Sequence, residues 1–384
     1  MSTVPNLPKT YRVALIEKKD EPFKLVSRDL VPPKEGQVLV KVLACGVCHS
    51  DGIVKHELMP VLPRVPGHEI IGDVVAIPAG EKKWKLGDRV GSGWQGGWCG
   101  TCSRCLKHDN MTCENGNING ILTDGGYGEY VYLRTEAVAS IPKELDPAEA
   151  APLMCAGITT FNSLRHMDVK PGEIVAIQGI GGLGHLAIQY SRAMGYRTVA
   201  LSTSAAKETL AKKLGAHIYL DSSKVDQAAE LQKLGGAKVM VCTAPSAEAI
   251  PKLLDGIIPG GTLLLLALAG DIVFPTLPII SKRIRVLGWP NGTAEDGEDT
   301  ADFSKLQNIK CMVERYPLDD VEKAYELMST NKAKFRAVIV PGLVSTPEMG
   351  EMKDSMAMKT PMMASDPPMA PKKKGLFKDG CGCM

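Results

Sequence analysis

The sequence predicts an α/β fold in which a doubly wound parallel sheet is joined to a second, mostly-β domain. Short β-type runs separated by Gly and Pro fill about the first 150 residues, and strands alternate with helices from residue 173 onward. The chain has 384 residues, enough for about two domains at roughly 150 residues per domain. Its 44% apolar and 23% charged residues exclude a coiled coil or a wholly disordered chain.

The all-β part begins the chain. Its β-type runs cover 37–43, 70–77 and 128–133, and turn residues separate them. The pattern is typical of an irregular β domain.

The α/β part follows from about residue 173. Strands at 174–178, 198–201, 218–220, 239–242, 262–268 and 284–287 are expected, with helices at 183–194 and 205–214. Such alternation favours a parallel sheet with helices on both faces. After Trp289 the alternation fades, and a helix at 318–328 precedes a last strand at 336–340.

Charge and hydropathy exclude several classes of protein. The net charge of +2 gives no electrostatic reason to expect nucleic acid. The longest apolar run, 263–269, is far shorter than the roughly 20 residues of a bilayer span, and the N-terminus has no secretory pattern. We expect a soluble, cytoplasmic protein. Residues 343–384, rich in Met, Pro and Lys, are predicted to be a disordered tail.

A glycine-rich turn joins the first strand of the α/β part to its helix. Backbone N–H groups of such a turn can approach a pyrophosphate at the positive end of the helix. A turn that serves only helix–sheet packing is the alternative. The residues are Gly179, Gly181, Gly182, Leu183 and Gly184.

The end of the next strand selects between the two nicotinamide cofactors. A carboxylate there would bind the ribose 2′-OH and repel a 2′-phosphate. This chain instead has Ser202, Thr203 and Ser204, followed by Lys207. Hydroxyls beside a cation favour NADP(H), and NAD(H) remains the alternative because Ser204 could simply cap a helix.

Four cysteines lie within fifteen residues, as Cys99, Cys102, Cys105 and Cys113. In a reducing compartment this spacing favours a metal over free thiols. Four thiolates form a closed site for a structural Zn²⁺, which would fix a protruding loop.

A second set of candidate ligands is scattered along the chain. It comprises Cys48 within Cys48-His49-Ser50-Asp51, His68 before Glu69, and Cys155. Taken alone, a single His is more often a satisfied polar residue, and Cys155 could be an apolar filler.

In their order and spacing, these motifs resemble those of the zinc-dependent alcohol dehydrogenases of the medium-chain dehydrogenase/reductase superfamily. The resemblance covers about residues 10 to 340, and the yeast-type and cinnamyl alcohol dehydrogenases are its nearest branches. It implies a GroES-like zinc catalytic domain (1–155 and 289–342) and a Rossmann dinucleotide-binding domain (156–288). Two Zn²⁺ per chain and a homo-oligomer, either dimer or tetramer, are implied as well.

The resemblance also implies roles by position. Cys48, His68 and Cys155 would hold the catalytic Zn²⁺, with Glu69 beside it and Asp51 orienting His68. Other roles follow from the same resemblance: Ser50 contacts the substrate alcohol, His49 and Arg336 lie near the pyrophosphate, Thr159 packs behind the nicotinamide, and Trp94 and Met59 line the alcohol pocket.

One position departs from that pattern. Ile53 stands where many members carry a histidine of the proton relay, so the relay would end elsewhere. His56 is close in sequence.

The chain ends Cys381-Gly382-Cys383-Met384 after a Lys cluster. A C-a-a-X box with Met last is a farnesylation signal, so Cys381 could give peripheral membrane association in a eukaryotic host. Gly382 is a poor aliphatic match. A solvated tail without a role, or thiols that bind stray metal, are the alternatives.

The sequence therefore predicts an enzyme that transfers hydride between a nicotinamide cofactor and a small alcohol/aldehyde pair. The alternatives are a zinc-independent quinone or enoyl reductase of the same superfamily and a non-catalytic cofactor-binding scaffold. Three intact candidate ligands argue against both.

Overall fold

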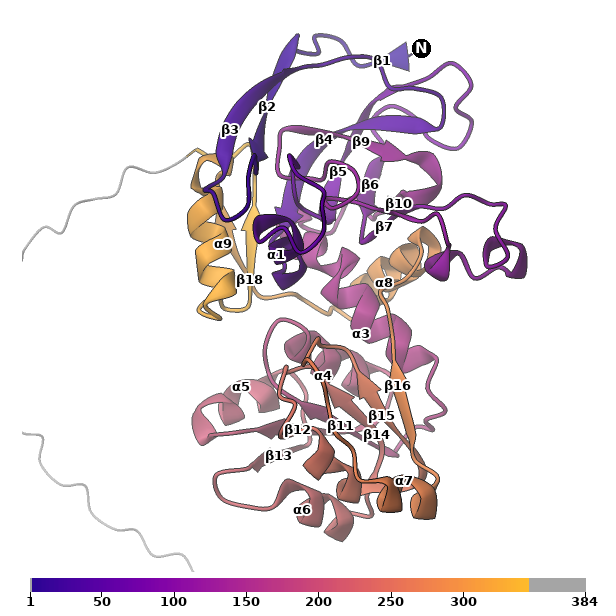
Figure 1. Cartoon of the computed structure of the whole chain (residues 1–384), viewed down its shortest axis with the longest axis vertical. Coiled ribbons are helices and arrows are strands. Elements are labelled where there is room, and N and C mark those ends of the chain that lie inside the picture. Colours follow the sequence, from indigo (N-terminus) through magenta and orange to yellow (C-terminus); the bar gives the residue numbers. More distant parts are fainter. Residues whose placement is uncertain (1, 345–384) are drawn as a thin grey trace, which may run out of the picture. The chain divides into compact units, whose positions relative to one another are not determined.

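The computed structural model describes residues 2–344, whose strands form two large sheets and two strand pairs (Figure 1). The predicted tail from residue 345 onward, with Cys381, lies outside the described residues. None of the helices within 2–344 combines the length and the apolar character that crossing a membrane would require.

The first large sheet has eight strands, in the order β10-β6-β5-β4-β18-β17, with β1 paired to β5 and β9 paired to β4. Most of its pairs are antiparallel, and β17–β18 is parallel. Its strands are β1 (Ser2–Thr3), β4 (Gln37–Gly46), β5 (Glu69–Ile77), β6 (Arg89–Ser92), β9 (Tyr130–Arg134), β10 (Ala139–Ser140), β17 (Val313–Tyr316) and β18 (Arg336–Ile339). Two further pairs are β2 (Thr10–Leu15) with β3 (Lys24–Asp29) and β7 (Gln95–Gly97) with β8 (Asn117–Ile118).

The second large sheet is parallel throughout, in the order β13-β12-β11-β14-β15-β16. Every residue of β11 is buried, as expected for a central parallel strand with helices on both faces. This confirms the predicted α/β fold. The strands are β11 (Ile174–Gln178), β12 (Arg197–Ser202), β13 (Ile218–Asp221), β14 (Ala237–Cys242), β15 (Ile257–Leu265) and β16 (Arg285–Gly288).

The helices of the described chain connect these strands. They are α1 (Gly52–Lys55), α2 (Pro147–Ala150), α3 (Ala156–Arg165), α4 (Gly184–Ala193), α5 (Glu208–Lys213), α6 (Gln227–Lys233), α7 (Thr276–Lys282), α8 (Ala294–Leu306) and α9 (Val321–Ser329).

Helix α8 was not predicted. Few of its residues are apolar, so a search for apolar periodicity misses it. Its start does carry a local signal, because Thr293 and Asp296 form a reciprocal capping box. Strand β15 also begins five residues before the predicted position 262.

Candidate active site

Two adjacent strand ends bring the first candidate ligands together. Gly46 at the end of β4 pairs with Glu69 at the start of β5. Cys48 therefore follows one strand and His68 precedes its neighbour. Cys155 joins them from the residue before α3.

The four side chains of Cys48, His68, Glu69 and Cys155 each offer one ligand atom, and these atoms all lie within 4.8 Å of one another. The sulfur atoms of Cys48 and Cys155 are 3.9 Å apart. His68 and Glu69 are fully buried, yet His68 Nε2 and both Glu69 oxygens have no hydrogen-bond partner. Buried polar atoms without partners cost free energy, so this donor set fits a bound cation such as Zn²⁺.

Asp51 lies behind this cluster. Its Oδ2 accepts hydrogen bonds from the Cys48 backbone N–H at 2.8 Å and from the Tyr127 hydroxyl at 2.7 Å. Its Oδ1 is 3.2 Å from Nδ1 of His68, outside hydrogen-bond geometry. The carboxylate lies on the Nδ1 side of the imidazole ring, which leaves Nε2 as the nitrogen that can serve as a ligand atom of the cluster.

The carboxyl group of Glu69 is held by its surroundings. Burial raises its pKa to about 7, although nearby Arg336 opposes the shift. Arg336 Nη1 lies 3.3 Å from Glu69 Oε1. A Cβ at Gly46 would come within 1.9 Å of Glu69 Oε2, so the carboxylate occupies space that only glycine leaves open.

The glycine-rich turn follows β11 and leads into α4. Gly179 has φ +91°, and a Cβ at Gly184 would lie 2.0 Å from the Gly179 carbonyl oxygen. Both glycines are therefore required for the turn. Arg336 also reaches the turn, since a Cβ at Gly182 would lie 3.0 Å from its Nε. One buried guanidinium thus lies between Glu69 and the glycine turn.

The residues expected to select the cofactor follow β12. Lys207 donates a hydrogen bond to the Ile180 carbonyl at 2.8 Å, so its ammonium group lies over the glycine turn. The Ser204 side chain makes no cap hydrogen bond, which removes helix capping as its role. Ser202, the last residue of β12, and the turn that follows it, with Thr203, carry no carboxylate.

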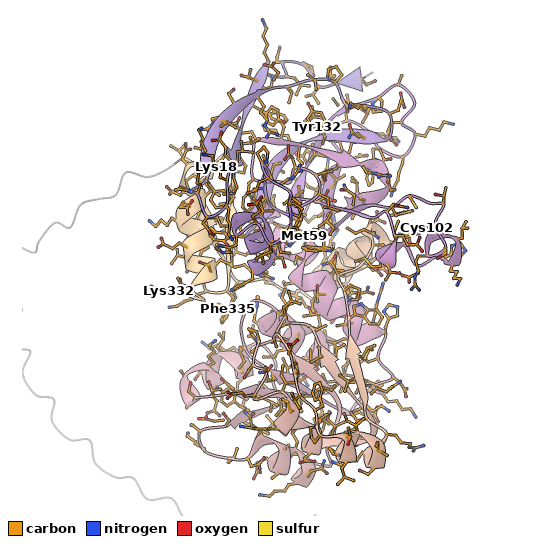
Figure 2. The ribbon with its side chains drawn as sticks, in the orientation of Figure 1. Lys18, Met59, Cys102, Tyr132, Lys332 and Phe335 are labelled. Carbon is orange, nitrogen blue, oxygen red and sulfur yellow. The ribbon has the colours of Figure 1, made fainter. Side chains whose placement is uncertain are left out.

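The four-cysteine group also assembles. Its sulfur atoms lie within 4.8 Å of one another, on a projecting lobe where Figure 2 labels Cys102. Backbone N–H groups of Cys99 and Cys102 point at the sulfurs of Cys113 and Cys99, at 3.4 and 3.3 Å. Hydrogen bonds from Thr101, Cys102 and Asn115 lower the pKa of Cys99 to about 5. Such a thiolate suits a metal.

Of the remaining predicted residues, Trp94 contacts the cluster directly. The Trp94 ring meets His68 edge-on, with centroids 5.2 Å apart. Ser50 and Thr159 are partly exposed, and His49 is exposed. Met59 is 38% exposed.

Sequence reasoning missed two buried residues of this site. Tyr127 holds Asp51, and the glycines that flank it were the available signal, because Gly126 and Gly128 leave no space for a Cβ. Asn291 donates from Nδ2 to the Cys155 carbonyl at 3.1 Å and fixes the backbone at that ligand.

His185 in α4 gives a pH-dependent stability. Its Nδ1–H donates to the Gly181 carbonyl at 2.9 Å, and its Nε2 accepts from the Met312 N–H at 3.2 Å. Burial lowers its pKa from 6.5 to about 4, and nearby Arg336 adds to the shift. Below pH 6.5 the His185 side chain takes up a proton in the unfolded chain, whereas in the folded chain it stays neutral down to about pH 4. The contribution of His185 to the free energy of unfolding is therefore complete above pH 6.5 and is lost as the pH falls below it.

Between pH 7 and pH 5 we expect the His185 contribution to the free energy of unfolding to fall by about 2 kcal/mol. Urea unfolding at the two pH values measures the fall, and His185→Gln should show a correspondingly smaller one. An equal fall in both proteins would contradict the assignment to His185.

Two family models match the chain. Residues 34–143 match the alcohol dehydrogenase GroES-like domain, and residues 182–306 match the zinc-binding dehydrogenase domain. Among curated proteins, alcohol dehydrogenase patD of Penicillium expansum is 47% identical over 86% of this chain and 98% of its own length. Alcohol dehydrogenase patD of Aspergillus clavatus is 46% identical over 89% of this chain and 95% of its own.

Solved structures agree with these matches. A cinnamyl alcohol dehydrogenase of Sorghum bicolor aligns with TM-score 0.78 and 28% identity over 86% of this chain and 98% of its own. The Helicobacter pylori CAD complexed with NADP(H) aligns with TM-score 0.76 and 29% identity over the same shares of the two chains.

Proposed function

The chain belongs to the zinc-binding alcohol dehydrogenase family, and from that premise we propose that it transfers hydride between NADP(H) and an alcohol/aldehyde pair. The observation that carries the proposal is the cluster of Cys48, His68, Glu69 and Cys155, of which the first three are buried and Cys155 is partly buried. A zinc-independent reductase or a non-catalytic scaffold gives no reason to bury these unpartnered atoms together.

We assign Cys48, His68 and Cys155 as ligands of a catalytic Zn²⁺. Such an ion supplies Lewis acidity, which lowers the pKa of an alcohol and polarises an aldehyde carbonyl. Asp51 and Tyr127 keep His68 oriented, and Glu69 and Arg336 supply balanced charges beside the cluster. Ser50 is the hydroxyl that exchanges a proton with the substrate oxygen. Trp94 and Met59 form walls of the substrate pocket.

The cofactor residues are assigned from the glycine turn. The turn and the start of α4 would bind the pyrophosphate, assisted by Arg336 and by His49. Thr159 would support the nicotinamide. Hydroxyls and Lys207 after β12, without a carboxylate, support NADP(H) over NAD(H). The Helicobacter relative in complex with NADP(H) supports the same choice.

The test is reduction of a panel of small aldehydes with NADPH and with NADH. We expect activity with NADPH at a higher kcat/KM than with NADH, about two zinc ions per chain, and loss of activity after chelation. Restored activity on adding Zn²⁺ is the control. Unchanged activity in zinc-free protein would favour the zinc-independent reductase, and absence of any turnover with stoichiometric NADPH binding would favour the scaffold.

The second zinc belongs to the four-cysteine lobe, where it would stabilise the fold. For the domains, we propose the limits given above: 1–155 with 289–342 for the catalytic domain and 156–288 for the dinucleotide-binding domain. The two large sheets support this division, because residues 174–288 supply every strand of the parallel sheet.

We further propose a homodimer through β16. This strand is the exposed edge of the parallel sheet, and α7 just before it exposes Leu277 (76%) and Ile280 (73%). An exposed edge strand beside apolar side chains fits a second copy of the same surface.

Sedimentation should give about twice the chain mass of 41.2 kDa. Leu277→Lys with Ile280→Lys should weaken association by about 100-fold, because two charges would be buried without partners. Leu306→Lys, at an equally exposed leucine (76%) on α8, is the matched control. Equal dissociation in both variants would contradict an interface at β16.

For the tail, we propose that Cys381 is prenylated in a eukaryotic host and that the Lys cluster before it adds attraction to anionic lipid. An intact mass that retains Met384 in that host would contradict the modification.

A further inference from the structure

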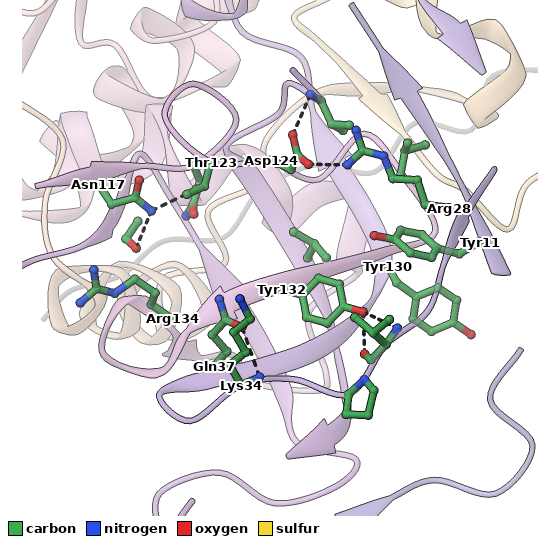
Figure 3. A pocket seen from close by; sticks show the side chains of 18 residues that line it. Tyr11, Arg28, Lys34, Gln37, Asn117, Thr123, Asp124, Tyr130, Tyr132 and Arg134 are labelled. Atoms are coloured by element: carbon green, nitrogen blue, oxygen red, sulfur yellow. Dashed lines mark hydrogen bonds and ion pairs between the residues drawn. The ribbon is translucent and has the colours of Figure 1, made fainter. Parts of the chain in front are cut away.

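A cavity in the described part of the chain is lined by residues that lie outside the proposed active site. It has a volume of about 310 Å³ and is formed by the β2–β3 pair, β9 and the loop 117–125 (Figure 3). None of the residues assigned above to zinc, cofactor or substrate lines it. The volume suits a small organic molecule.

Part of the cavity wall is apolar and aromatic, and the rest carries the polar side chains of Gln37, Asn117, Asn119 and Thr123. Val13, Val65 and Val131 contribute to its walls, with the rings of Tyr11 and Tyr132. Tyr132 is fixed, because its hydroxyl donates to the Val31 carbonyl at 2.7 Å and accepts from the Val31 N–H at 3.0 Å. Burial raises the pKa of Tyr11 to about 12, so its hydroxyl remains protonated at neutral pH. These walls fit a flat aromatic ring.

The charges of the cavity lie at two separate ends. At one end the single carboxylate of Asp124 is shared by Arg28, which lines the cavity, and Arg64, at 3.3 Å, which does not line it. At the other end, across the cavity in Figure 3, are Arg134 and Lys34.

Arg134 is already paired with Glu136 and donates to the Trp98 carbonyl at 3.0 Å. Lys34 forms no ion pair with a described residue. The second end therefore carries a cation whose charge the protein leaves unbalanced.

From this distribution we propose that the cavity binds an aromatic carboxylic acid. The ring lies against the valines and Tyr11, and the carboxylate lies at the Lys34 end. Among the lining side chains, Lys34 is the cation that no described carboxylate pairs. One such cation beside the valines and tyrosines matches one negative charge on a planar acid better than the doubly charged group of a phosphate ester.

The cavity is also separate from the catalytic cluster. Gly125 lines the cavity, and its backbone N–H donates a hydrogen bond to the Val65 carbonyl at 2.7 Å. The N–H of the next residue, Gly126, donates to the Gly67 carbonyl at 2.9 Å. The segment 65–67 thus stands between the cavity and His68. An acid bound here does not exclude an aldehyde from the active site.

The experiment is calorimetric titration of the zinc-loaded, NADPH-saturated protein with 2-naphthoate, and with the uncharged 2-naphthamide. We expect saturable binding of the acid, with the amide about tenfold weaker. Lys34→Glu should raise the Kd of the acid by about tenfold or more. Lys82→Glu, at an exposed lysine that does not line the cavity, should leave the Kd within about twofold.

Several outcomes would overturn the proposal. These are no saturable binding, equal binding of the amide, or equal weakening by Lys34→Glu and Lys82→Glu. Displacement of 2-naphthoate by an aldehyde substrate would place it at the catalytic cluster instead, and tighter binding of phenyl phosphate would exclude a carboxylate preference. Each is distinguishable from failure of the dehydrogenase assignment, because binding is measured without turnover.

Discussion

Replacing Cys48 with alanine is expected to lower kcat/KM for aldehyde reduction by at least about 1,000-fold, equivalent to about 4 kcal/mol of transition-state stabilisation. The substitution removes one of the donors whose ligand atoms lie within 4.8 Å of one another, and it leaves His68 Nε2 buried without a partner. Zinc content should fall from about two to about one per chain, because the four-cysteine lobe is untouched.

The matched control is Cys45→Ala. Cys45 is also buried and lies three residues earlier, on β4, but its sulfur belongs to neither ligand group. We expect it to keep both zinc ions and its activity, and to lose only packing energy of about 1–2 kcal/mol. Metal analysis with the aldehyde assay measures both variants. Full zinc occupancy in Cys48→Ala would refute the ligand assignment.

The second large effect is expected at Gly184. A methyl group there would lie 2.0 Å from the Gly179 carbonyl oxygen, a backbone atom that cannot move without reshaping the turn. We expect Gly184→Ala to lower the free energy of unfolding by about 3 kcal/mol and to weaken NADPH binding by at least about tenfold.

Gly181 offers the comparison within the same turn, because a Cβ there meets no atom within 4 Å. The free energy of unfolding of Gly181→Ala should lie within about 1 kcal/mol of the wild-type value. Urea unfolding and NADPH fluorescence titration measure the pair. Equal stability of the two variants would mean that the turn does not need the close approach seen here.

Local patterns were sufficient for much of the fold. Strand β11 was predicted with the bounds that the structure shows. A short apolar run between a turn and a glycine motif is typical of a buried strand and too short for a helix. Helix α8 was missed because its residues are mostly polar and its burial depends on α3, which is distant in sequence.

The residues of the two candidate metal sites also differ in how far the sequence alone could predict them. Cys99, Cys102, Cys105 and Cys113 are close in sequence, so spacing alone indicates that they assemble. Cys48, His68 and Cys155 were grouped only through the family resemblance, since no local pattern brings them together. Tyr127 and Asn291 were missed because their partners lie 76 and 136 residues away.

The hydrogen bonds of Asp51 have a consequence for reversibility. Asp51 joins the Cys48 backbone just after β4 to Tyr127 by two hydrogen bonds, and its carboxylate lies 3.2 Å from Nδ1 of His68; these contacts need no metal. The zinc-free catalytic cluster therefore keeps its shape and can be reloaded by diffusion of the ion alone. In the cysteine lobe, by contrast, many of the cross-links run through the sulfurs themselves. Recovery after chelation is therefore expected in two steps. The catalytic cluster regains its zinc as fast as the ion enters, whereas the cysteine lobe regains its structure only as fast as its chain refolds.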